Sequence, residues 1–216
     1  VDVSLIDPVV KEYTVELARS ARETLDILVR TELETGANVI YEGGKTSRAT
    51  LASGDKPTVD TFRKARLQMQ RAFVKPCSKG RYVALVSPSV VFDLLDDPKF
   101  LKAYEMQENG RPLIEGEIAD VYGIKFVEVE NPSIFDAAGA SGVDVHASIM
   151  LGQEAYGITK IQGNGDVQTI HKGLGSAGTA DPLNQRQSIG WKVNAFVAKR
   201  LYEEGIVRIE SVPTNQ

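Results

Sequence analysis

Residues 7–36 read DPVVKEYTVELARSARETLDILVRTELETG and form the longest regular stretch of this sequence. Apolar side chains recur in it at steps of three and four residues, which is the spacing along one face of an α-helix. These residues are Val10, Tyr13, Leu17, Ala21, Leu25 and Leu28. The opposite face carries Lys11, Glu12, Glu16, Arg19, Arg22, Glu23, Asp26 and Arg30. Such a helix would be roughly 40 Å long. A compact domain of this size does not need that length, so we expect a spine around which the rest of the chain is arranged.

The ends of this predicted helix carry their own signals. Asp7 can cap the free amides, Pro8 suits the first helical position, and Gly36 suits a left-handed stop. Charged residues four apart are spaced for ion pairs: Arg19 with Glu23, Arg22 with Asp26, and Asp26 with Arg30. We expect the apolar stripe to pack on a sheet formed by the last strands, and the charged face to be exposed in the isolated chain.

The composition narrows the class of protein. A chain of 216 residues, 42% hydrophobic and 25% charged, fits one large domain or two small ones. It contains no signal-peptide pattern and no apolar run near the roughly 20 residues of a membrane helix. Its single cysteine, Cys77, excludes an internal disulfide, and its net charge of −4 argues against a large nucleic-acid-binding face. Because the sequence begins at Val1 rather than Met, we expect a fragment or a processed form.

A second helix is predicted between Thr58 and Phe73, where apolar and basic residues alternate in a helical rhythm after Pro57. Its exposed face carries Arg63, Lys64, Arg66 and Arg71. We favour a solvated face, and the alternative is a contact with an acidic neighbouring subunit.

Short strands and loops make up most of the remaining chain. The predicted strands are Tyr82–Val86, Ile124–Val129, Val143–Leu151, Tyr156–Ile161, Ile189–Val197 and Ile206–Ile209. The alternation in the third of them predicts a half-buried strand. Ser87 and Pro88 mark the start of a helix that is interrupted or bent near Pro98. Predicted loops are Glu42–Lys56, Asp136–Gly142 and Gln162–Asp181.

Two glycine-rich segments resemble phosphate-binding motifs, but their contexts argue against that function. Gly43–Thr46 matches the tail of a P-loop, yet Val39 stands where the full motif needs glycine, and no helix pattern follows. Gly173–Gly178 has the spacing of a dinucleotide fingerprint, yet Thr179–Pro182 follows where a helix is required. We therefore predict loops at both places.

The usual catalytic groups also lack the arrangements that catalysis needs. His146 lies on the polar side of a strand, His171 lies beside a glycine loop, and Cys77 follows a proline. Gly139–Gly142 lacks the spacing of a serine nucleophile elbow. The carboxylate pairs Asp96–Asp97 and Glu203–Glu204 are typical of helix ends and turns. We predict no catalytic residue, no cofactor-binding residue and no metal ligand.

Four segments, taken in their order, resemble a known family. They are Gly80–Pro88 followed by a helix, Gly116–Ile118 with Gly123–Glu128, Gly152–Gly157, and Asp181–Arg186 with Gly190–Lys192 and Val207–Glu210. Their identity and order are similar to those of the major capsid proteins of tailed bacteriophages, specifically the phage N-four type. The resemblance spans most of the chain from Thr58 onward.

The resemblance implies an α+β fold of the Hong Kong ninety-seven capsid type. In that fold a long spine helix and a small sheet form a peripheral domain, and a mixed sheet with helices forms an axial domain. Mapped here, residues 1–56 would hold the spine helix of the peripheral domain, 57–142 the axial domain, and 143–216 strands that return mostly to the peripheral domain. The family's N-terminal arm and extended hairpin loop precede the spine helix, so we expect this sequence to lack both.

The function implied by the resemblance is that of a structural protein rather than an enzyme: a major head protein of a phage or prophage. It would self-assemble into the icosahedral shell that encloses double-stranded DNA. Shell proteins need extended lateral surfaces rather than a deep pocket. The implied partners are other copies in pentamers and hexamers, with scaffold or decoration proteins as further candidates. Packaged DNA would be contacted only indirectly, and no membrane would be involved.

The implied location is the virion capsid, with the host cytoplasm during assembly. Two alternatives stay open because a fold does not fix a function. One is a nucleotide-binding enzyme that uses the Gly173–Gly178 loop. The other is a non-viral shell protein of the same fold.

Overall fold

The computed structural model describes residues 6–77, 80–105, 117–159, 167–176, 182–183, 185, 187–194 and 196–215. The chain divides into two compact units. Unit 1 comprises Val1–Val29 and Ile158–Lys199, and unit 2 comprises Arg30–Gly157 and Arg200–Gln216.

The predicted spine is the helix α1 (Ile6–Glu34), so the expectation of one long helix is confirmed. Its ends differ from the prediction. Asp7 lies inside the helix rather than capping it, because the helix already begins at Ile6. Gly36 does not adopt the left-handed conformation expected of it. It is buried instead, and a Cβ added there would lie 3.7 Å from Cγ2 of Ile206. Gly36 is therefore a packing position close to the last strand.

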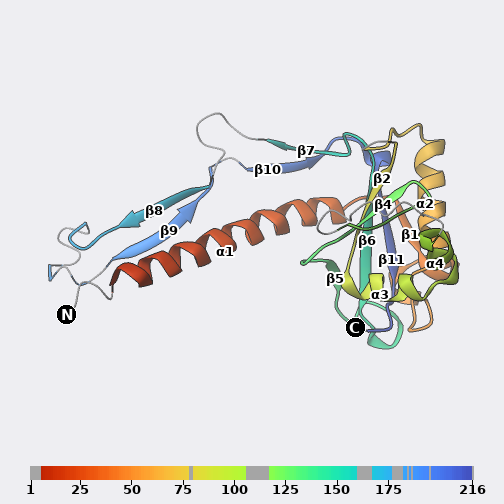
Figure 1. Cartoon of the computed structure of the whole chain (residues 1–216), viewed down its shortest axis with the longest axis horizontal. Helices are drawn as coiled ribbons and strands as arrows, with labels where there is room; N and C mark the ends of the chain where they lie inside the picture. The colour runs from red at the N-terminus through yellow and green to blue at the C-terminus, as the bar shows by residue number, and fades with distance from the viewer. Residues whose placement is uncertain are drawn as a thin grey trace. The chain divides into compact units, whose positions relative to one another are not determined.

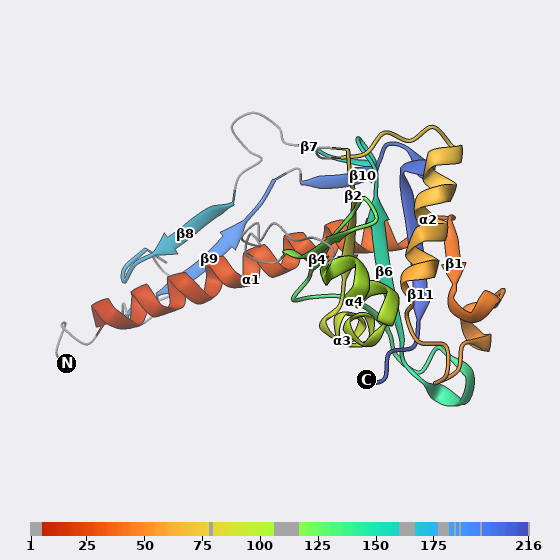
Figure 2. The same cartoon turned by 45° about the vertical axis from the view of Figure 1, so that its right-hand side comes forward.

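The apolar stripe of α1 is only partly covered. Ala21 is buried and Leu17 and Leu25 are half-buried, but Tyr13 is 62% exposed and Leu28 is 49% exposed. In unit 1 the strand β9 (Ser188–Lys192) runs beside α1 in both views (Figures 1 and 2). The views do not show which side chains of α1 this strand contacts, so packing of the stripe on the last strands stays a prediction.

The charged face of α1 is exposed as predicted, with one exception. Arg19 Nε and Glu23 Oε1 form the expected pair at 3.1 Å, and both side chains are exposed. Arg30 was expected beside Asp26, but its Nε pairs with Glu34 Oε1 at 3.1 Å. Its Nη1 also donates to the backbone carbonyl of Asn131, so Arg30 holds the last turns of α1 to a loop of unit 2.

The β-structure of unit 1 was incompletely predicted. The strand β8 (Gln168–Lys172) lies within a segment predicted to be a loop, and it pairs antiparallel with β9. The hairpin is largely exposed, so β8 has no buried face that would leave an apolar alternation in the sequence. The single strand expected over 189–197 is divided into β9 and β10 (Val197–Arg200). β10 pairs with β7 (Tyr156–Thr159), which matches the expected strand from Tyr156.

Unit 2 is built on a mixed sheet in the order β1-β11-β6-β2-β4-β3, with β5 paired to one end of β6. Its strands are β1 (Val39–Tyr41), β2 (Tyr82–Val86), β3 (Glu117–Val121), β4 (Ile124–Glu128), β5 (Ser133–Phe135), β6 (Val145–Leu151) and β11 (Ile206–Ser211). The β1–β11 and β2–β4 pairs are parallel, and the others are antiparallel. Helices and a mixed sheet together give the α+β class that was expected. The strands β3 and β5 were not foreseen.

Three helices pack on one face of this sheet: α2 (Val59–Arg71), α3 (Pro88–Asp96) and α4 (Pro98–Glu105). As predicted, Ser87 caps α3 by accepting a hydrogen bond from the Val90 amide, and the chain breaks at Pro98 into two helices. Among the described helices, none combines the length and hydropathy that a membrane crossing requires.

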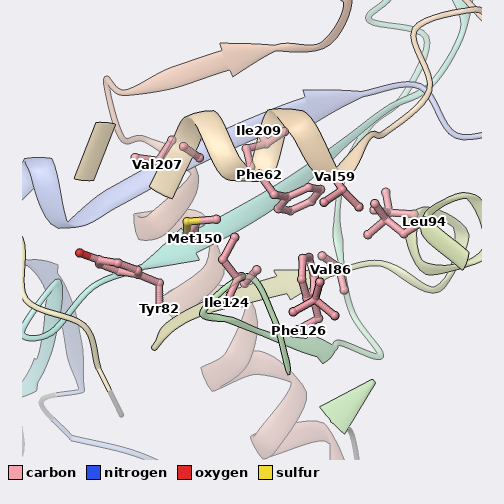
Figure 3. Packing of buried hydrophobic residues seen from close by; sticks show 14 of the residues in the cluster. Val59, Phe62, Tyr82, Val86, Leu94, Ile124, Phe126, Met150, Val207 and Ile209 are labelled. Carbon is pink, nitrogen blue, oxygen red and sulfur yellow. The ribbon is translucent and has the colours of Figure 1, made fainter. Parts of the chain in front are cut away.

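The largest apolar cluster lies between these helices and the sheet (Figure 3). In this cluster Phe126 is in edge-to-face contact with Phe62 of α2 at 5.2 Å and with Phe100 of α4 at 5.6 Å between ring centroids. Met150 of β6 and Ile209 of β11 belong to the same cluster, so strands distant in sequence share one core.

The prediction that residues 143–151 form a half-buried strand is wrong. Every residue of β6 and of β11 is buried. The reason is the segment 42–56, which was predicted to be an exposed loop. It contains two 3₁₀ turns (Glu42–Gly44 and Arg48–Thr50) and places Leu51 in a second apolar cluster with Val145 and Val212. This cluster covers part of the other face of the sheet, at the amino end of β6. Two further 3₁₀ turns are Ala140–Gly142 and Glu203–Gly205.

Candidate functional site

His146 is a buried structural residue. It lies on β6, and its Nδ1 is 2.9 Å from Oγ of Ser87, the residue that caps α3. Burial lowers the pKa of His146, and the nearby Asp144 carboxylate opposes that effect. A neutral imidazole accepts the Ser87 hydroxyl proton at Nδ1, while the hydroxyl oxygen accepts from the Val90 amide. The pair therefore joins a helix start to the sheet, and both side chains are too buried to meet a substrate.

The lowered pKa of His146 predicts a pH dependence of folding. The unfolded chain takes up a proton below about pH 6.5 that the folded chain resists, so the free energy of unfolding should fall as the pH drops from 7 to 5. Urea unfolding at both pH values should show a smaller fall for His146→Asn than for the unmutated chain. His171→Asn is the matched control, because His171 is exposed and should leave the pH dependence unchanged. Equal pH dependence in all three proteins would contradict the prediction.

Neither His171 nor Cys77 belongs to a reactive arrangement. His171 is an exposed residue of β8. Cys77 donates through Sγ to the carbonyl of Leu151 at 3.3 Å, and burial raises the pKa of its thiol, which disfavours the nucleophilic thiolate. In the part of the chain that the structure describes, no three His, Cys, Asp or Glu residues gather in a group that could hold a metal ion.

The described residues of the two glycine segments form turns. Gly43 and Gly44 have φ values of 65° and 70°, and the carboxylate of Asp55 occupies the space beside Gly43 that a Cβ would fill. A negative group at this place opposes phosphate binding, and the next described α-helix begins only at Val59. Residues 173–176 form a turn after β8, and residues 177–178 of that motif lie outside the described residues.

The paired carboxylates hold elements of unit 2 together. Asp97 Oδ2 accepts from the Val59 amide at 3.1 Å and so joins the start of α2 to the end of α3. Glu203 accepts from the Ala37 amide and, at 2.6 Å, from Arg200 Nη1, next to the end of α1. Gly139–Gly142 ends in a 3₁₀ turn. Asp97 and Glu203 therefore have structural roles, as the sequence indicated.

The most notable polar cluster was not predicted: a buried ion network around Glu210. The side chain of Glu210 is completely buried in β11. Arg48 binds it with two hydrogen bonds, from Nε at 2.8 Å and from Nη2 at 2.7 Å, and Arg208 Nε donates at 2.7 Å. Phe135 receives the Arg48 guanidinium on its ring at 3.3 Å from the centroid. The hydrogen bond between Arg48 and Glu210 is the main reason that the pKa of Arg48 is raised.

This network explains how the segment 42–56 is attached to the last strand of the sheet. Arg48 comes from that segment and Glu210 from the last strand, 162 residues later. In the sequence, Arg208 and Glu210 are two residues apart and so lie on the same side of the last strand, opposite its apolar residues. Nothing local to Arg48 distinguishes it from a solvated loop residue, so no signal could have paired it with Glu210.

The basic face of α2 is only partly solvated. Arg63 pairs with Asp60 at 3.1 Å and lies over the ring of Tyr122 at 4.8 Å. Arg66 is half-buried and donates to the backbone carbonyl of Tyr122. The other two residues of the predicted basic face, Lys64 and Arg71, are exposed.

Several large apolar side chains are exposed on both units. They include Tyr13, Val15, Leu174 and Leu183 in unit 1, and Phe73, Phe92, Ile134 and Leu201 in unit 2. When such residues form contiguous patches they mark interaction surfaces rather than sites of chemistry. These exposed side chains are therefore candidates for contacts with other proteins.

The comparisons with known proteins agree with that view. A family model described as phage capsid protein matches residues 2–209. The fold is similar to the capsid of Ralstonia phage GP4 (TM-score 0.58, 18% identity, 82% of this chain and 53% of that chain). It is also similar to the capsid of the cyanophage P-SCSP1u (TM-score 0.66, 16% identity, 94% and 66%). A third similar structure is the SrpI encapsulin complex of Synechococcus elongatus (TM-score 0.55, 12% identity, 95% and 65%).

These likenesses establish the fold, which is that of phage capsid structures. The chain spans about half to two thirds of the length of the three shell proteins. A comparison with curated protein sequences returns no match. The family model covers nearly the whole chain. This chain belongs to the phage capsid protein family.

Proposed function

We propose that this chain is a major capsid protein that assembles, with copies of itself, into the icosahedral shell around phage double-stranded DNA. The observation that carries the proposal is the family match over residues 2–209. The uncovered apolar side chains of both units add support, since repeated lateral contacts would bury them. In this proposal the protein has no enzymatic activity and is part of the virion, after assembly in the host cytoplasm.

The partners follow from this function. Other copies form the pentamers and hexamers, and scaffold or decoration proteins bind some of the remaining surfaces. The net charge of −4 suits a shell that confines DNA without binding it tightly. Contact of the basic face of α2 with an acidic neighbouring subunit belongs to the same proposal.

The domain assignment is also a proposal, and the compact units refine it. Unit 1 combines most of a long helix with the β8–β9 hairpin, which matches the description of a peripheral domain. Unit 2 combines a mixed sheet with three helices, which matches an axial domain. The division originally made at residues 57, 142 and 143 changes accordingly. The strands β1, β6 and β11 share a sheet with β2 and β4, so we propose that residues 30–56, 143–157 and 200–216 also belong to the axial domain.

Electron microscopy of the purified full-length protein tests the proposal. We expect closed shells, and a protein that stays monomeric under all assembly conditions would contradict it. Detection of the protein in purified DNA-containing virions separates a phage shell from a non-viral shell, which the likeness to an encapsulin keeps as an alternative. A thermal-shift assay with ATP and NAD should leave Tm unchanged, whereas a rise would favour the nucleotide-binding alternative.

A further inference from the structure

Phe73 occupies a backbone position that usually belongs to glycine. The end of α2 has the hydrogen bonds of a Schellman motif, from the Val74 amide to the Met69 carbonyl at 3.0 Å and from the Phe73 amide to the Gln70 carbonyl at 3.1 Å. The residue in the middle of such a motif is left-handed, and Phe73 has a φ of 58°. An aromatic residue there is unfavourable for the isolated chain, because its Cβ crowds the backbone.

The side chain of Phe73 is not buried within its own chain, so no packing contact with the described residues offsets the unfavourable backbone conformation. It is 92% exposed, whereas the next residue, Val74, is buried and satisfies the apolar contact that such a motif needs. A strained and solvated aromatic ring indicates a contact outside the described chain. Arg71 and Lys75, which flank Phe73 in the sequence, are exposed as well, so the residues two positions on either side of the ring are basic. We call Arg71, Phe73 and Lys75 the Phe73 patch.

A second exposed apolar residue lies in the opposite electrostatic setting. Ile134 of β5 is 43% exposed, and the exposed charged residues nearest to it in the sequence are Glu130 and Asp136. Arg30 fixes the loop before β5 through its hydrogen bonds to Asn131. We call Glu130, Ile134 and Asp136 the β5 patch. The two patches are complementary in charge. In the Phe73 patch the apolar residue stands between two basic residues, and in the β5 patch it stands between two acidic residues.

The sheet keeps the two patches apart in a single copy. The Lys75 carbonyl accepts from the Gln153 amide, and β2 pairs Val83 with Leu151, so the Phe73 patch lies at the carboxyl end of β6. The β5 patch lies at the amino end, where Phe135 pairs with Val145. Six residue steps along a strand separate these ends by about 20 Å. Figure 1 shows the same arrangement in unit 2, with the end of α2 and the strand β5 at opposite ends of the sheet. Only another molecule can bring such patches together.

We infer that the Phe73 patch of one copy binds the β5 patch of a second copy of this chain. The inference rests on the proposed function and adds to it a specific contact. Because two different surfaces meet, the contact is head-to-tail, and such contacts generate closed rings when the rotation between copies closes. Phe73 is the buried anchor of the contact, and the surrounding charges select the partner surface.

The first test separates folding from assembly in the full-length protein. Phe73→Gly removes the ring and relieves the backbone, so Tm of the unassembled protein should be unchanged or up to about 4 °C higher. The fraction of protein recovered in shells by sedimentation should fall at least about tenfold. Phe73→Tyr should assemble like the unmutated protein. Ser141→Gly is the matched backbone control, because Ser141 has a φ of 61° outside both patches and should not affect assembly.

The second test is a charge reversal between copies. Arg71→Glu and Asp136→Lys should each lower the yield of shells, and the double variant should assemble better than either single variant. The inference would be overturned, while the proposed function stands, if Phe73→Gly assembled fully. It would also be overturned if the double variant gave no higher yield of shells than the better-assembling single variant. Failure of the unmutated protein to form shells would instead contradict the proposed function itself, and the inference with it.

Discussion

Glu210→Gln is expected to lower the free energy of unfolding by about 3–5 kcal/mol, which is the usual effect of removing one partner of a buried ion pair. The Glu210 side chain is fully buried, and that of Arg208 is 11% exposed. Without the carboxylate charge, the Arg208 guanidinium would stay in the protein interior with no opposite charge to balance it. Arg48 would lose both of its charged hydrogen bonds, and the segment 42–56 would lose its attachment to the last strand.

Urea unfolding followed by circular dichroism measures this loss. Glu23→Gln is the matched control, because it makes the same chemical change at the exposed Arg19–Glu23 pair and should change stability by less than about 1 kcal/mol. Arg48→Ala should lie between the two, since the side chain of Arg48 is 30% exposed and water can partly replace it as a partner. If Glu210→Gln had no more effect than Glu23→Gln, the network would not be what holds segment 42–56 in place.

Local signals in the sequence were sufficient for most of the helices and for the central strand. The bounds of β2 were predicted without error, because a short apolar run is followed directly by Ser87 and Pro88, which start a helix. Most of the length of α1 follows from its apolar repeat, which runs from Val10 to Leu28 over about five turns. These features depend only on neighbours in the sequence, which is why they could be predicted.

Burial could not be predicted in the same way, because it depends on what lies across the sheet. The strand β6 has an alternating sequence, yet both of its faces are covered. The cover of its second face includes Leu51 and Arg48, from a segment whose glycines and polar residues are typical of an exposed loop. The strand β8 was missed for the opposite reason, since it belongs to an exposed hairpin.

The functional prediction came from the order of short family motifs rather than from a site. The absence of a catalytic residue stays a prediction, and the structure shows only that some of the flagged groups have structural partners, such as Ser87 for His146. The surfaces that matter for a shell could not be identified from sequence. An exposed Phe73 has the same sequence signature as a buried one, and only its φ and its exposure distinguish the two.

Phe126 connects the helices of unit 2 to the sheet, so its truncation should be as damaging as the loss of Glu210. The ring is 1% exposed and meets the rings of Phe62 and Phe100 edge to face, which places α2, β4 and α4 around one side chain. Such aromatic pairs stabilise beyond the area that they bury. Because the interior is close-packed, the surrounding strands and helices cannot readily move together to fill a cavity at this point.

Phe126→Ala should therefore lower the free energy of unfolding by about 3–5 kcal/mol, through the lost apolar transfer and the cavity that remains. Phe92→Ala is the matched control, because it removes the same atoms from α3 where the ring is 52% exposed, and it should change stability by less than about 1 kcal/mol. Both values come from urea unfolding of the purified chain, with the m-value checked for equal exposure of surface on unfolding. Phe126→Leu should recover part of the loss, because it refills part of the cavity. An equal effect of Phe126→Ala and Phe92→Ala would mean that the three-ring cluster is not the centre of this core.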